Sequence, residues 1–133
     1  MSASAKIRLA WAAVAAGVLL GGCAVAPAGG LSEVMQRPAE RALLAGLRAY
    51  DDAQYADAER ELGKALASGL VSAKDRATAH KHLAFLYCTS QRIKPCEEAF
   101  RAARVADASF TLSRAEAGHP LWGPVYKRVA AAP

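Results

Sequence analysis

Three cysteines and three histidines are the residues of this 133-residue chain whose side chains could do chemistry. His80 and His82 are two residues apart on a predicted helix, so they point to different sides and cannot share a metal ion. His119 precedes a proline and has no carboxylate or cysteine at a recognisable catalytic spacing. The sequence also contains no glycine-rich phosphate loop, HExxH motif or CxxC motif. We therefore predict neither an enzyme nor a metal or cofactor site.

The number of cysteines is odd, and the first of them, Cys23, has a distinctive setting. Two basic residues near the start precede an apolar run over residues 9–20, and two glycines stand directly before the cysteine. The run is about a dozen residues long, whereas a helix needs roughly 20 to span a bilayer. These proportions indicate a secretory signal and not a permanent membrane anchor.

The residues Leu20-Gly21-Gly22-Cys23 resemble the lipobox of bacterial lipoproteins, in which a branched apolar residue and two small residues precede a cysteine. In that family the thiol receives a diacylglyceryl group, the signal is removed, and the new amino terminus is acylated. The resemblance implies that Cys23 holds the chain on a membrane through several acyl chains, which anchor stably where one chain does not. Ala24 stands where an aspartate favours inner-membrane retention in enterobacteria, so the outer membrane is implied. The alternative is an ordinary cleaved signal with an incidental cysteine.

These features divide the chain into three parts. Residues 1–22 are the predicted signal, and residues 23–37 are the lipidated cysteine followed by a stretch rich in Ala, Gly and Pro, which is typical of a flexible tether. Residues 38–133 contain no alternating, β-branched run of strand length, so we predict an all-α domain there. The length supports one domain and leaves no room for a large two-domain catalytic cleft.

The formal net charge of +5 does not indicate a nucleic-acid-binding protein. Lys6 and Arg8 lie in the predicted signal, which leaves 15 Lys and Arg against 12 Asp and Glu, a net charge of +3. A nucleic-acid interface needs clustered cations. Here the cations are interleaved with acids along the chain, as on an ordinary solvated surface, and we predict no nucleic-acid partner.

Start and stop signals set the expected helix boundaries. Pro38 and Pro95 suit first turns, Gly69 suits a C-terminal cap, and the pairs Ser72/Asp75 and Ser113/Glu116 have capping-box spacing. The expected helices run from Pro38 to about Asp52, from Tyr55 to Ser68, from Ser72 through Thr89, from Pro95 with Glu97 and Glu98 in its first turn, from Ser113 to about Gly118, and from Val125 to Ala132.

A repeat links the first four of these helices. Four positions recur 38 residues later, with Gly46, Ala58, Leu62 and Ala65 matched by Ala84, Cys96, Phe100 and Ala103. Small residues at the first two positions let the helices of a hairpin approach closely, and a large residue fills the space beside them. The pattern resembles the tetratricopeptide repeat, with about four residues inserted around 69–73 relative to its usual 34. A generic amphipathic helical bundle is the alternative.

Two such hairpins are marginal alone, because each buries its face only against a neighbour. We expect the tail, residues 110–126, to close the stack. Its GHPLWGP segment, residues 118–124, is rich in turn-forming residues, so Trp122 could fold back on the last hairpin. A recognition surface centred on Trp122 is the alternative, since tryptophan often anchors protein interfaces.

Cys88 and Cys96 would be exported together, in a compartment that permits disulfides, once Cys23 carries lipid. They lie near the facing ends of two predicted antiparallel helices, so a disulfide between them is geometrically plausible. Against this, Cys96 occupies a repeat position that needs a small buried residue, a role that a free cysteine fills well. Both interpretations stay open at this point.

A further set of residues resembles a narrower family, the small tetratricopeptide lipoproteins of the TssQ type, which are associated with bacterial type VI secretion systems. The resemblance covers about residues 46–126 and depends on the run from Ala79 to Cys88, followed by Arg92, Cys96, Phe100, Phe110, Glu116, Gly118-His119-Pro120 and Trp122-Gly123-Pro124. It implies an accessory, non-enzymatic protein of the cell envelope, and it names no partner.

The functional hypothesis is an outer-membrane lipoprotein that exposes its repeat domain to the periplasm. It would act as an adaptor for protein partners of an envelope complex, namely components of a secretion apparatus. Because such repeats bind through the concave face, the expected partner-binding residues are Lys81, His82, Phe85 and Trp122. The alternative is a purely structural lipoprotein that tethers or spaces envelope layers, for example through peptidoglycan.

Overall fold

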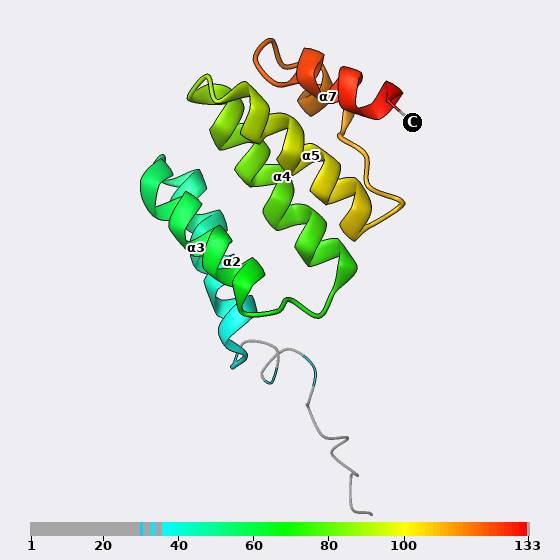
Figure 1. Cartoon of the computed structure of the whole chain (residues 1–133). Coiled ribbons are helices and arrows are strands. Elements are labelled where there is room, and N and C mark those ends of the chain that lie inside the picture. Colours follow the sequence, from blue (N-terminus) through cyan, green and yellow to red (C-terminus); the bar gives the residue numbers. More distant parts are fainter. Residues whose placement is uncertain (1–29, 31–32, 34–35, 133) are drawn as a thin grey trace, which may run out of the picture.

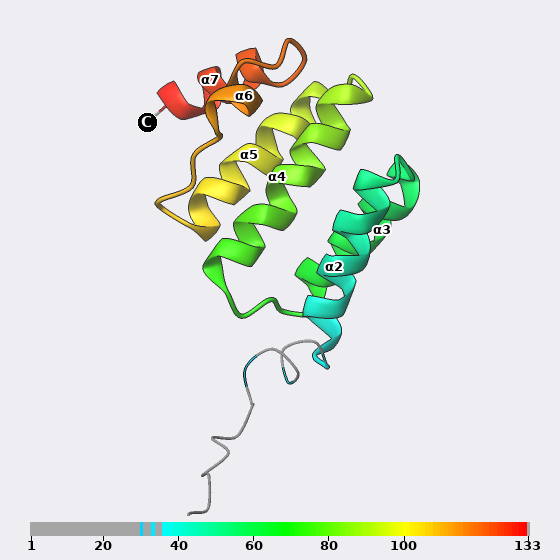
Figure 2. The same cartoon turned by 180° about the vertical axis from the view of Figure 1, so that it is seen from behind.

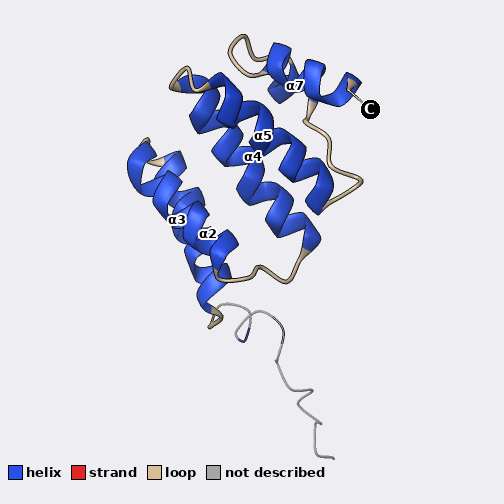
Figure 3. Cartoon of the chain, in the orientation of Figure 1, coloured by secondary structure: helices blue, strands red, loops and turns tan. Residues whose placement is uncertain are grey.

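The computed structural model describes residue 30, residue 33 and residues 36–132, and these residues form helices and no strand (Figure 3). The helices are α2 (Pro38–Asp51), α3 (Tyr55–Ala67), α4 (Ala73–Thr89), α5 (Ile93–Ala106), α6 (Arg114–Ala117) and α7 (Gly123–Ala131). The all-α prediction is confirmed. None of the helices described here is both long and apolar enough to cross a bilayer. The predicted signal, Cys23 and most of the predicted tether lie outside the described residues.

The helices pack in chain order (Figures 1 and 2). Helices α2 and α3 form one antiparallel hairpin, α4 and α5 form a second, and α3 packs against α4 between them. The tail then crosses the second hairpin, and α7 packs against α5. The start of α2 and the C-terminal end of α7 therefore lie at opposite ends of the fold.

Local capping chemistry sets most of the helix boundaries as predicted. Helix α2 begins at Pro38, and Gly69 follows α3 with φ +84°, a backbone conformation that glycine adopts without strain. The Ser72 hydroxyl accepts a hydrogen bond from the Asp75 amide at 3.2 Å, which is half of a capping box. At α6 both halves of the Ser113/Glu116 capping box are present.

Two predicted helix starts were wrong by two residues. Helix α5 begins at Ile93, so Pro95 lies inside the first turn and Glu97 and Glu98 lie beyond it. A proline is tolerated there because the first amides of a helix have no partner within the helix. Helix α7 likewise begins at Gly123 and not at Val125, with Pro124 in its first turn.

The positions matched by the 38-residue repeat are buried in both hairpins. All eight side chains or glycine sites are covered, namely Gly46, Ala58, Leu62, Ala65, Ala84, Cys96, Phe100 and Ala103. The closest approach is at Gly46, where an added Cβ would lie 2.8 Å from the Cγ atom of Leu62. The small residues in the sequence pattern therefore permit the helix contact that the pattern predicted.

The connection between the hairpins, which includes the predicted insertion, is held by its own contacts. Leu70 is buried in the core. The Arg76 guanidinium donates hydrogen bonds of 2.8 Å to the carbonyl oxygens of Leu70 and Val71. Because a side chain of α4 satisfies these carbonyl groups, the longer connection is held against the start of the second hairpin.

Cys88 and Cys96 form a disulfide, with their Cα atoms 5.3 Å apart. The bond joins the last turn of α4 to the first turn of α5. Both cysteines are buried, so Cys96 is also the small core residue that the repeat position requires. The disulfide interpretation is confirmed, and it does not conflict with the packing interpretation.

Two glycine substitutions test the close approach of α2 and α3. Gly46→Ala should lower the free energy of unfolding by about 1–3 kcal/mol, because the new methyl group would overpack the buried Leu62. Gly63→Ala is the matched control, since its Cβ would meet nothing within 4 Å, and it should raise stability by up to about 1 kcal/mol. Urea unfolding curves measure both values. If both substitutions raised the free energy of unfolding, the close approach of the two helices at Gly46 would be contradicted.

Removal of the disulfide should lower the stability of the domain, although the bond closes only a short loop. Cys88→Ala/Cys96→Ala should lower the free energy of unfolding by about 2–3 kcal/mol, because the unfolded chain gains the entropy of an open loop. Chemical denaturation with and without a reductant measures this, since reductant should destabilise the parent chain and leave the double variant unchanged. Equal stability of parent and variant would show that the bond contributes nothing.

Candidate functional site

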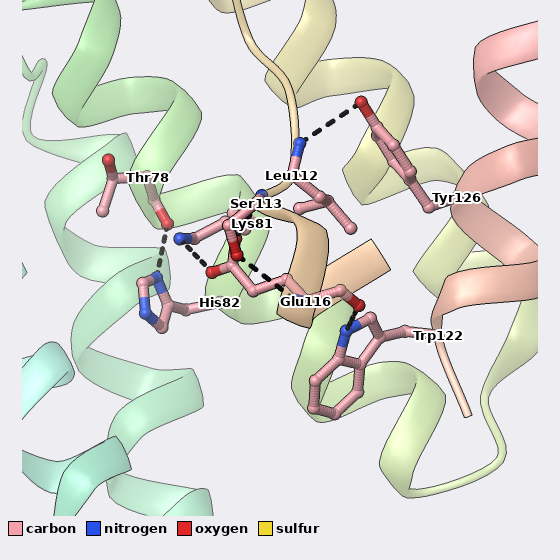
Figure 4. A network of polar contacts seen from close by, with 8 residues as sticks. All are labelled: Thr78, Lys81, His82, Leu112, Ser113, Glu116, Trp122 and Tyr126. Carbon is pink, nitrogen blue, oxygen red and sulfur yellow. Dashed lines mark hydrogen bonds and ion pairs between the residues drawn. The ribbon is translucent and has the colours of Figure 1, made fainter. Parts of the chain in front are cut away.

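Glu116 fastens the tail to the second hairpin (Figure 4). One carboxylate oxygen accepts from the Ser113 amide at 2.9 Å, and the other accepts from the Lys81 ammonium group at 2.7 Å. The backbone carbonyl of Glu116 accepts from the Trp122 indole N–H at 2.9 Å. One residue thus caps α6, pairs with α4 and orients the tryptophan of the tail.

The environment of Glu116 keeps it ionised. Burial raises the pKa of its carboxyl group, but hydrogen bonds from Lys81 and Ser113 more than offset this and place the pKa below 4.5. The side chains of Lys81 and Glu116 are 21% and 28% exposed, so solvent screens the ion pair only partly. The pair therefore contributes mainly by fixing the position of α6 against α4.

Trp122 lies between two rings. Its indole stacks on Phe85 of α4 with ring centroids 4.3 Å apart and on His119 of the tail with centroids 3.3 Å apart. Phe85 is only 4% exposed beneath it. The prediction that Trp122 folds back on the last hairpin is confirmed.

The same row of rings continues to the first hairpin. His82 contacts Phe85 on one side and Tyr50 on the other, with centroids 5.8 and 5.1 Å apart, and Tyr50 contacts Tyr55 at 6.0 Å. The His82 Nδ1 atom lies 2.8 Å from the Thr78 carbonyl oxygen, which assigns the proton to Nδ1. The row therefore crosses from α4 to the turn between α2 and α3.

The structure brings the four predicted partner-binding residues together. Three of them make contacts within the domain and so stabilise the fold. Lys81 is paired with Glu116, Phe85 is covered, and His82 packs between rings. Of the four, Trp122 alone lines the pocket between the two hairpins and the tail.

A pocket of about 580 Å³ opens where both hairpins and the tail meet. The first hairpin contributes Tyr50, Tyr55, Ala56 and Glu59, the second contributes Leu86, Thr89, Ser90 and Arg92, and the tail contributes His119, Leu121 and Trp122. Sequence reasoning missed this site, because its walls come from three segments that are distant in the chain. The only available signal was that aromatic residues stand beside the predicted turn at the end of α2.

One ion pair forms the charged part of the pocket wall. The Arg92 guanidinium donates two hydrogen bonds to the Glu59 carboxylate, at 2.9 and 2.7 Å, and it also lies over the Tyr87 ring. The hydrogen bond from Arg92 lowers the pKa of Glu59 below 4.5. Because the pair joins α3 to the turn after α4, it holds the two hairpins in register across the pocket.

The walls of the pocket are suited to binding an apolar side chain. Most of the lining is aromatic or aliphatic, and Glu59 and Arg92 neutralise each other.

In the part of the chain that the structure describes, no three His, Cys, Asp or Glu residues are grouped so that they could hold a metal ion. Comparison of the chain with protein-family models, with curated proteins and with solved structures finds no match.

Stability should fall as the pH drops below neutrality. Burial lowers the pKa of His82 and of His80 below 6.5 in the folded chain, so the unfolded chain binds these protons more readily. The stabilisation is complete above pH 6.5 and is lost as the pH falls toward the lower folded values. Urea unfolding at pH 7.5 and pH 5.5 should give the lower free energy of unfolding at pH 5.5.

The variant His82→Asn separates this effect from other titrations. It also loses ring packing, so only the difference in unfolding free energy between the two pH values is compared. That difference should be smaller in the variant than in the parent chain, because one of the two half-buried imidazoles is gone. Glu116 does not interfere, since its lowered pKa makes its contribution change only below pH 4.5. An unchanged difference would contradict the assignment to His82.

Proposed function

We propose that this chain is a lipid-anchored protein-interaction module of the bacterial cell envelope. Residues 1–22 direct export, Cys23 carries the lipid in the outer membrane, and the helical domain binds protein partners in the periplasm. The resemblance to TssQ-type lipoproteins supports a type VI secretion apparatus as the source of those partners.

The packing of the helices supports the tetratricopeptide assignment within this proposal. Two hairpins follow each other in chain order, and the matched repeat positions are buried at equivalent places in both. The tetratricopeptide repeat customarily ends in a proline, and Leu70 and Ala108 stand at those positions here. Leu70 is buried in the core and so holds the connection between the hairpins. Interaction through a concave surface is the usual activity of such stacks.

The observation that carries the proposal is the pocket with two half-exposed apolar side chains on it. Leu121 is 49% exposed and Tyr55 is 51% exposed, and both line the pocket, one from the tail and the other from the first hairpin. Apolar side chains that surround a pocket are typical of the centre of a protein interface, where a partner's anchor residue excludes water. The structure holds both side chains in place, through the Trp122 stack and through the Tyr50 contact.

The test is a change of these two side chains and not of Trp122, whose loss would release the tail. Leu121→Ser/Tyr55→Ser should reduce capture of a secretion component from detergent-solubilised envelope by at least about tenfold, the loss expected for a hot spot. Val105→Ser is the matched control, because Val105 is 88% exposed but does not line the pocket. Quantitative mass spectrometry of the captured proteins gives the comparison with an unrelated lipoprotein.

Three outcomes separate the proposals. Loss of capture with the double variant alone supports the pocket as the binding site. Equal capture by parent and double variant contradicts that site. If no secretion component is enriched, and the chain binds purified sacculi instead, the structural alternative through peptidoglycan replaces the adaptor proposal.

A further inference from the structure

Helix α2 presents a basic face to solvent. Arg37 precedes the helix, and Arg41, Leu44 and Arg48 follow at spacings that place all four on one side. All four are exposed. The basic face runs along the whole helix, from Arg37 at the end of the predicted tether to Arg48 in the last turn.

Comparison of the two hairpins shows that this face ends the stack. In α4, which packs against the preceding hairpin, Ala79, Leu83 and Leu86 are buried. The positions 38 residues earlier in α2 are Arg41, Ala45 and Arg48, and all three are exposed. Arg41 and Arg48 thus replace residues that are apolar in α4. A further hairpin cannot pack on this face, because burying unpaired guanidinium groups costs free energy. The face therefore suits a partner that offers negative charge.

The arginines are available to such a partner. Neither Arg41 nor Arg48 has an acidic partner among the residues that the structure describes. Arg37 makes only a long contact of 3.8 Å with the exposed Glu33. Guanidinium groups bind phosphate oxygens in a planar, bidentate manner, so a layer of phosphate groups fits three arginines on one face.

We propose that this basic face of α2 docks on the anionic phosphate headgroups of the bilayer in which Cys23 is anchored. The inference rests on the lipid anchor of the proposed function. The predicted tether ends where α2 begins, and its 14 residues give an end-to-end distance of about 20 Å. The face is thus held close to the headgroups, where each arginine strengthens attachment about fivefold.

Docking by this face also orients the proposed binding site. Tyr50 follows Arg41 by nine residues, which places it on the opposite side of α2, where it lines the pocket. Helix α7 lies at the far end of the fold from α2 (Figure 2). With the arginines on the bilayer, the pocket and α7 face the periplasm.

The test uses the full lipidated chain in vesicles of phosphatidylcholine, with and without 30% phosphatidylglycerol. Phenylglyoxal modifies accessible arginines, and mass spectrometry gives the rate at each site. Arg41 and Arg48 should react at least about fivefold more slowly on the anionic vesicles in 50 mM salt, and 0.5 M salt should abolish the difference. Arg114, which is exposed on the tail, should react at the same rate on both.

A pair of variants isolates the contribution of the face. Arg41→Gln/Arg48→Gln should remove the protection of Arg37, whereas Arg101→Gln/Arg128→Gln, with the same charge change far from this face, should keep it. Equal modification of Arg41 and Arg48 on both vesicles overturns the docking, as does protection that arises only when an acidic envelope protein is added. Failure of the chain to float with either vesicle instead overturns the lipid anchor.

Discussion

The stack of Trp122 on Phe85 is the contact on which the rest of this structure depends. Without it Phe85 of α4 would lose the ring that covers it, and the second hairpin would lose the contact that caps it. The stack also places His119 and Leu121, so it builds the tail's side of the pocket. Glu116 fixes the position of this stack. Its backbone carbonyl accepts a hydrogen bond from the indole, and its carboxylate holds α6 on α4.

The two ends of the stack are closed in different ways. At the C-terminal end the tail covers the second hairpin with apolar side chains, including Val125 and Val129 on α7. At the N-terminal end the chain supplies no covering helix among the described residues, and Arg41 and Arg48 stand where α4 has buried apolar residues. Arg41 and Arg48 therefore give the outer face of the first hairpin a polar surface, as is usual at the end of a repeat stack.

Local signals predicted the helices well because capping is local chemistry. The Ser113/Glu116 box and Gly69 marked their boundaries, and the repeat identified the close contact at Gly46. The error at Pro95 arose because proline fits several positions of a first turn. The pocket could not be predicted in this way, since Tyr55 and Leu121 line one pocket only after the tail has folded back.

Some residues near the pocket hold the fold together, and others are exposed on its wall. This difference decides which substitutions can test binding. Sequence reasoning favoured large or charged residues on one helix face, and such residues are also those that the core uses, as Phe85 shows. Tyr55 and Leu121 line the pocket, and about half of each residue is exposed to solvent. A change at Trp122 would remove the stack, the indole hydrogen bond and the pocket wall together. Binding can therefore be separated from folding only at the exposed side chains.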